Sequence, residues 1–186
     1  MTAAEPEQQQ GDPEMEKLLL GVLACVCHAL ADAGRAVCCC KWYRGRARPP
    51  MDGCDCTCDD NGVEGQGVAW IRWVSTGPDA RTRRTELERR GFGGSSCFEG
   101  IGDDGIRVTF EVGVYRCAPA GDPDTGPECS EDTQIAADLG WDDRLIRTAV
   151  MCCEAVRGRR LMLVLQEPDG PAGGCVGSVG TWTVDL

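Results

Sequence analysis

Residues 106–119 read IRVTFEVGVYRCAP, and apolar and polar side chains alternate along this stretch with a period of two. Such alternation predicts a β-strand with one apolar face and one face in contact with water. The stretch ends at Pro119, and a loop rich in Gly, Pro and Asp follows. We therefore expect the long strand Ile106–Arg116 to organise the fold.

Helical patterns lie on both sides of this strand. The first begins at Asp12-Pro13, because Asp can cap a helix and Pro is tolerated at its first position. Its apolar residues recur at helical spacing up to Gly34, which is a typical stop. The second helix begins at Ser130, and we expect Gly140 to break or bend it. The apolar residues of the two helices are Leu19, Leu23, Val26 and Leu30, and Ile135, Leu139, Leu145, Ile146, Ala149, Val150 and Cys153.

Shorter strands are predicted at residues 36–43, 68–74 and 161–165, with a turn at 168–174 and a closing strand at 176–184. In the second of these, Trp70, Ile71 and Trp73 put bulk on both faces, which favours a strand buried on both sides over one that faces a partner. The fold class is therefore α+β, a mostly antiparallel sheet packed with two helices and joined by long loops. We expect a flexible N-terminal arm at residues 1–11 and a single domain at 12–186, with an extended loop at 77–105.

The chain is acidic, with 30 acidic and 19 basic residues among 186 and a formal charge of −11. Such a surface repels nucleic acid and argues against binding driven by phosphate contacts. The most apolar run, Leu18 to Val26, is about half of the roughly 20 residues that a membrane helix needs. Acidic residues precede this run, so we expect neither a signal peptide nor a membrane anchor.

Fourteen cysteines are present, a density typical of secreted disulfide scaffolds. Because no signal peptide is expected, free thiols are the interpretation that we favour, with Cys25, Cys27, Cys152 and Cys153 acting as small apolar residues in helices. Disulfides come second, and oxidising conditions outside a cell favour them. A metal site is the weakest alternative, because the C-x-C spacing is tighter than that of zinc sites. The candidates are Cys54, Cys56 and Cys58 for a metal, and Cys38, Cys40, Cys54, Cys56 and Cys58 for disulfides.

The extended loop combines arginines with glutamates and then reads Gly91-Phe92-Gly93-Gly94. It lacks the order of a phosphate-binding loop. In an acidic protein, pairing with neighbouring subunits or a solvated loop is a better explanation than phosphate binding. The candidate interface residues are Arg81, Arg83, Arg84, Arg89, Arg90 and Phe92.

No catalytic arrangement is apparent in the sequence. The only histidine, His28, lies in the first helix, and no cysteine stands out as a nucleophile. Adjacent carboxylates such as Asp142-Asp143 point apart on a helix, so they make poor acid–base partners. We expect a protein that is not an enzyme and that needs no cofactor.

Four short motifs, in this order and spacing, resemble the neck and tail-terminator proteins of actinobacterial siphophages. Together they extend from residue 31 to residue 153, and the order of the predicted elements is also similar to that of tail terminators. The motifs are Ala31-Asp32-Ala33-Gly34-Arg35 with Cys38, Gly67-Val68-Ala69-Trp70-Ile71-Arg72, the segment from Phe110 to Pro119, and Ala149-Val150-Met151-Cys152-Cys153.

The resemblance implies a virion structural protein at the head–tail junction, assembled in the host cytoplasm. Six copies would form a ring that caps the tail tube and contacts the tube protein and a head-completion (stopper) protein. DNA would pass through the negative lumen without specific binding. The loop arginines would then dock onto neighbouring acidic patches. The alternatives are another ring of the neck, a stopper or connector, or a cysteine-based metal- or redox-binding module.

Overall fold

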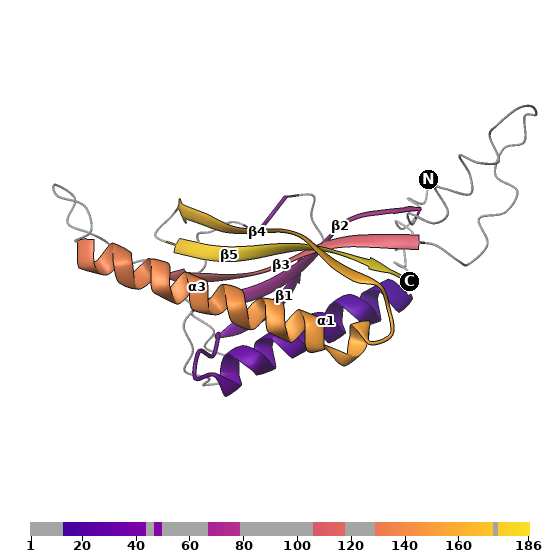
Figure 1. The fold of residues 1–186 in the computed structure, drawn as a ribbon, viewed down its shortest axis with the longest axis horizontal. Helices are drawn as coiled ribbons and strands as arrows, with labels where there is room; N and C mark the ends of the chain where they lie inside the picture. Colours follow the sequence, from indigo (N-terminus) through magenta and orange to yellow (C-terminus); the bar gives the residue numbers. More distant parts are fainter. Residues whose placement is uncertain (1–12, 44–46, 50–66, 79–105, 118–128, 173–174) are drawn as a thin grey trace, which may run out of the picture.

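The computed structural model describes residues 13–43, 47–49, 67–78, 106–117, 129–172 and 175–186 (Figure 1). This part of the chain forms a five-stranded sheet in the order β1-β2-β3-β5-β4, in which only the β1–β2 pair is parallel. The predicted α+β class with a mostly antiparallel sheet is therefore confirmed. The elements are α1 (Pro13–Asp32), β1 (Cys39–Tyr43), β2 (Val68–Pro78), β3 (Ile106–Cys117), α3 (Cys129–Cys152), the 3-10 turn η1 (Glu154–Val156), β4 (Leu161–Ala172) and β5 (Cys175–Asp185).

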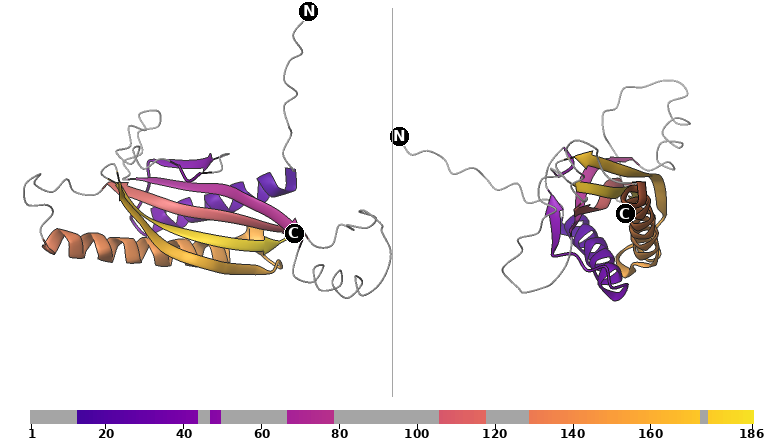
Figure 2. Two further views of the ribbon diagram at one scale, coloured as in Figure 1. Left: turned by 90° about the horizontal axis from the view of Figure 1, so that it is seen from above. Right: turned by 90° about the vertical axis from the view of Figure 1, so that its left-hand side faces the viewer.

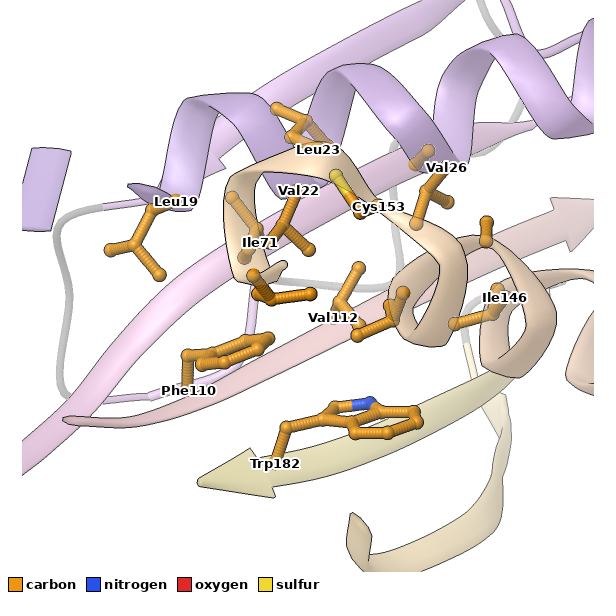
Figure 3. Packing of buried hydrophobic residues seen from close by; sticks show 14 of the residues in the cluster. Leu19, Val22, Leu23, Val26, Ile71, Phe110, Val112, Ile146, Cys153 and Trp182 are labelled. Atoms are coloured by element: carbon orange, nitrogen blue, oxygen red, sulfur yellow. The ribbon is translucent and has the colours of Figure 1, made fainter. Parts of the chain in front are cut away.

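Both helices cover the same face of the sheet and run in opposite directions (Figures 1 and 2). Helix α1 packs against β1 and β2, and α3 packs against β5. The main core fills the space between the two layers, where side chains from α1 meet those of β2, β3 and β5 (Figure 3). The largest fully buried residues include Trp182, Phe110, Leu19 and Ile146.

Strand β3 lies at the centre of the sheet, paired with β2 on one side and β5 on the other. Val108, Phe110 and Val112 alternate along its helix-facing side and are fully buried. The expectation that its other face is wet is wrong along the second half of the strand, because Glu111 is only 7% exposed and Tyr115 only 3%.

The first helix has the predicted bounds and the predicted stop. Gly34 adopts a φ of +71°, a left-handed conformation that glycine reaches without strain. The amides of Gly34 and Arg35 donate to the carbonyls of Ala31 (2.9 Å) and Leu30 (2.8 Å), which ends the helix in a Schellman motif. In α3, by contrast, the expected break at Gly140 is wrong. The helix continues through this exposed position, where one glycine costs only about 1 kcal/mol.

Strand β1 is shorter than predicted, because it begins at Cys39 and not at residue 36, whereas β2 and β4 extend well beyond their predicted ends. Strand β2 is buried on both faces only up to Arg72, then shifts register between Trp73 and Ser75, and Trp73 is 43% exposed. The turn expected at residues 168–174 is wrong for its first part, because β4 stays paired with β5 through Pro168 and Asp169. A border strand tolerates proline, since a missing N–H on its outer side breaks no bond of the ladder.

Candidate functional site

Disulfides tie α1 to the rest of the core. Cys25 is bonded to Cys153, directly after α3, with their Cα atoms 5.8 Å apart, and Cys27 is bonded to Cys40 of β1 at 6.5 Å. Our preference for free, apolar cysteines at 25, 27 and 153 is therefore wrong. The physical reason is that packing α1 against α3 and β1 brings these residues into the range of Cα separations that a disulfide requires.

Four further described cysteines have an assigned state. Cys38, Cys39 and Cys175 are also disulfide-bonded, whereas Cys152 is a free, exposed thiol on the last turn of α3. The weak metal candidates Cys54, Cys56 and Cys58 lie outside the described residues. Within the described ranges, no three side chains of His, Cys, Asp or Glu are placed to hold a metal ion.

A buried carboxylate joins the middle of α3 and the segment after α1 to the sheet. Asp142 of α3 is fully buried and accepts hydrogen bonds from Arg35 (Nε, 2.6 Å; Nη2, 3.1 Å) and from Arg116 of β3 (Nε, 2.9 Å; Nη2, 3.1 Å). Arg35 also donates to Oδ1 of Asp138 at 2.9 Å. We call these four residues the Asp142 cluster. Its two guanidinium groups and two carboxylates balance, as a charged group inside a protein requires.

The electrostatics of this cluster are set by the arginines. Burial alone raises the pKa of Asp142, but the hydrogen bonds from Arg35 and Arg116 outweigh it and hold the pKa below its usual value. The hydrogen bond between Arg35 and Asp142 also raises the pKa of Arg35. Asp142 is therefore ionised at neutral pH, with both oxygens occupied, and is not available as a general acid or base. Its neighbour Asp143 points elsewhere, to Arg147 and Ser178, as the helical geometry predicts.

A second polar cluster covers the outer face of the sheet, opposite the helices. Arg72 of β2 donates to Oε2 of Glu111 at 2.7 Å, and Arg48 donates to both oxygens of Glu111 at 3.2 and 3.3 Å. Arg48 reaches further, to Glu167 and Asp169 of β4. The hydroxyl of Tyr115 donates to Asp169 at 3.1 Å. We call this set the Glu111 cluster: Arg48, Arg72, Glu111, Tyr115, Glu167 and Asp169.

The Glu111 cluster explains why the outer face is buried. Burial alone raises the pKa of Glu111, but the hydrogen bonds from Arg72 and Arg48 lower it below the usual value. Burial, together with the charge and hydrogen bond of Asp169, raises the pKa of Tyr115, so this hydroxyl stays protonated. The Tyr115 ring also packs against the buried Trp70, with the ring centroids 5.4 Å apart. The cluster therefore anchors the segment at Arg48 across β2, β3 and β4.

The described surface also exposes several large apolar side chains. Three of them, Met162, Val164 and Leu165, follow one another along the first half of β4, with exposed fractions of 42%, 58% and 48%. Trp73 and Val74 lie at the register shift of β2, and Met151 lies near the end of α3. None of the described helices is long and apolar enough to cross a membrane.

Other predicted site residues lie outside the described part of the chain. The interface candidates Arg81, Arg83, Arg84, Arg89, Arg90 and Phe92 are outside the described residues, as is the N-terminal arm. His28 is exposed on α1. No family model and no curated protein sequence matches this chain.

Sequence reasoning missed the two charge clusters. In the sequence, Arg35, Arg72 and Arg116 stood out only as parts of the motifs that carry the resemblance, and nothing singled out Arg48. One signal was available: Glu111 interrupts a run of apolar and small residues at the centre of the long strand β3, where an unpaired carboxylate is costly. A charge in that position indicates a nearby opposite charge, although it does not say which residue supplies it.

Proposed function

We propose that this chain is a structural subunit of a phage neck, in the position of a tail terminator. Six copies would form a ring that caps the tail tube and joins it to the head in the virion. The order of the elements supports the proposal: α1, three strands of which β3 is the longest, α3 and two final strands. This is the order that the resemblance to tail terminators implies.

The buried charged residues of the described part favour assembly over catalysis. The buried carboxylates Asp142 and Glu111 form ion pairs with arginines, so both stabilise the packing of the fold. The exposed apolar side chains of β4 are groups that an assembly can cover. Six copies of a chain with a formal charge of −11 would surround the passing DNA with negative charge, which disfavours tight phosphate contacts.

The decisive experiment is native mass spectrometry of the purified chain, alone and with a tail tube protein, combined with negative-stain imaging. The proposal predicts a species of six times 19.9 kDa and a ring with a central opening. A chain that stays monomeric both alone and on tubes would contradict it. Binding to a head protein and not to tubes would favour a stopper or connector.

The loop arginines provide a second test. Reversing the charge of Arg83, Arg84, Arg89 and Arg90 together is expected to abolish head–tail joining and to leave the subunit folded. Lysates would then contain separate heads and tails, counted by electron microscopy. A normal yield of complete particles would remove the docking role.

The disulfides weigh against the metal-binding form of the cysteine-based module. That alternative uses Cys38 to Cys40 and Cys54 to Cys58. Cys38, Cys39 and Cys40 are disulfide-bonded, and Cys54, Cys56 and Cys58 lie outside the described residues. A disulfide sulfur has no thiolate to offer a metal. Elemental analysis of oxidised and reduced protein compares the two proposals directly, because stoichiometric zinc in either form would favour the module.

A further inference from the structure

The first half of β4 is a sheet edge without charges or prolines. Strand β4 is the outermost strand at one border of the described sheet (Figure 2, left). Its residues 161–166 read LMLVLQ, whereas residues 167–171 read EPDGP. Native proteins protect border strands with charges and prolines, because unpaired backbone groups there accept a strand from another chain. Here both devices are confined to the second half of the strand.

The opposite border of the described sheet differs from β4 in each respect. Strand β1 has five residues, carries the exposed Lys41, and is tied to α1 through the Cys27–Cys40 disulfide. A short strand with a lysine is a poor template for pairing. Between the two borders of the described sheet, the first half of β4 is therefore the better site for a further strand.

The side chains of this segment add an apolar surface to the edge. Met162 pairs with Thr183 and Leu165 with Thr181, and the register shifts between Leu163 and Leu165. This bulge leaves Val164 without a partner on β5 and places both Met162 and Leu165 on the outer face of the sheet. All three side chains are between 42% and 58% exposed.

The charges that flank the segment select its partner. The exposed Arg160 precedes it, and its carbonyl accepts the amide of Asp185, so the ladder extends to this residue. Glu167 follows the segment and lies on the outer face of the sheet, as Met162 and Leu165 do. An antiparallel copy of the strand would place Arg160 opposite Glu167 and Met162 opposite Leu165. A parallel copy would place like charges side by side, which is unfavourable.

We propose that a second copy of this chain pairs with the first through antiparallel contact of the two β4 strands. The two-fold axis passes between Leu163 and Val164. The contact therefore contains two pairs of Arg160 and Glu167, one on each side of the axis. The two sheets become one continuous sheet across the contact. Because such a two-fold contact closes on itself, it does not rest on the proposed ring, which needs head-to-tail contacts.

The mass of the oxidised full chain tests this contact, measured by native mass spectrometry and by light scattering over a concentration series. Exposed thiols such as Cys152 are first alkylated, so that no intermolecular disulfide mimics the dimer. We expect a dimer of twice 19.9 kDa. Val164→Lys should raise the dissociation constant of the dimer at least about tenfold, since each lysine would be buried opposite Leu163 of the other copy, with the second lysine beside it across the axis. Met151→Lys is the matched control, because Met151 is equally apolar and 64% exposed on α3, and it should leave dimerisation unchanged.

The flanking charges test the antiparallel register. Arg160→Glu and Glu167→Lys should each weaken the homodimer, and an equimolar mixture of the two variants should restore dimers, because both cross-pairs are then of opposite charge. Glu167 also binds Arg48, so the fold of Glu167→Lys is checked by circular dichroism, and Arg160→Glu alone still tests the contact if that variant unfolds.

The outcomes separate this contact from the proposed ring. A monomeric wild-type chain at high micromolar concentration, or a Val164→Lys variant that dimerises like the wild type, would overturn the β4 contact. Rings that persist in Val164→Lys would leave the ring proposal standing without it. Dimers that never assemble into rings would support the contact and count against the ring.

Discussion

Arg116 holds Asp142 through two parallel hydrogen bonds, from Nε to Oδ2 at 2.9 Å and from Nη2 to Oδ1 at 3.1 Å. The same guanidinium donates to the carbonyl oxygens of Arg35 at 2.8 Å and Ala36 at 3.3 Å. One side chain thus joins the end of β3, the middle of α3 and the segment that follows α1. Asp142 is fully buried, so this junction is made away from solvent.

Asp142→Asn is expected to destabilise the fold by about 3–5 kcal/mol, because it leaves two guanidinium groups without their shared countercharge. The free energy of unfolding, measured by urea denaturation, gives the value directly. Asp143→Asn is the matched control, since its side chain is 25% exposed and its ion pair with Arg147 is a surface i,i+4 pair worth at most about 0.5 kcal/mol. Asn also keeps an oxygen that can accept the long hydrogen bond from Ser178. Equal effects of the two substitutions would contradict the role assigned to the Asp142 cluster.

Acid should unfold the protein through the same buried carboxylates. The pKa of Glu111 lies below its usual 4.5 and that of Asp142 below its usual 3.8 when the chain is folded. As the pH falls, the unfolded chain takes up these protons first, so stability is lost progressively from about pH 5 downward. Urea midpoints measured from pH 7 to pH 3 should show this fall.

Glu111→Gln is expected to flatten the fall, in addition to lowering stability at neutral pH. Glu154→Gln, which changes an exposed surface carboxylate, is the control and should leave the unfolding free energy at neutral pH nearly unchanged. A Glu111→Gln profile parallel to that of the wild type would show that Glu111 does not contribute to the pH dependence.

Local patterns were sufficient for the elements with local causes. Helix α1 has an acidic first turn and ends at a left-handed Gly34, and its predicted and observed bounds agree. The alternation along β3 identified the helix-facing side correctly. It could not show that the other side is covered, because Arg48 binds Glu111 from 63 residues away.

Features that depend on packing partners were predicted poorly. Pro168 marks a turn by composition, yet it continues a strand because β4 lies at the border of the sheet, where its missing N–H costs nothing. Cysteines 25 and 153 look like apolar helix residues, and only the arrangement of α1 beside the end of α3 brings them together. Strand order and disulfide pairing are long-range properties, for which one sequence carries little local signal.

The two described disulfides should differ in their effect on stability. Cys25–Cys153 spans 128 residues and Cys27–Cys40 spans 13. A bond that closes a longer loop restricts the unfolded chain more, and a loop of about 15 residues corresponds to roughly 3 kcal/mol. Replacing Cys25 and Cys153 together by alanine should therefore lower the unfolding free energy more than replacing Cys27 and Cys40. The reverse order, measured without reductant, would show that the other cross-links dominate the unfolded state.

Two glycine substitutions should change stability in opposite directions. A Cβ on Gly113 would lie 2.8 Å from Cζ2 of the buried Trp70 and 2.9 Å from the carbonyl oxygen of Ser178. Because the backbone of β5 cannot move away without breaking its pairing with β3, Gly113→Ala should lower the unfolding free energy by about 1–3 kcal/mol.

Gly140 is exposed in the interior of α3, and a Cβ there meets nothing within 4 Å. Gly140→Ala should therefore raise the unfolding free energy by about 0.5–1 kcal/mol, and a loss of stability in that variant would contradict a continuous α3.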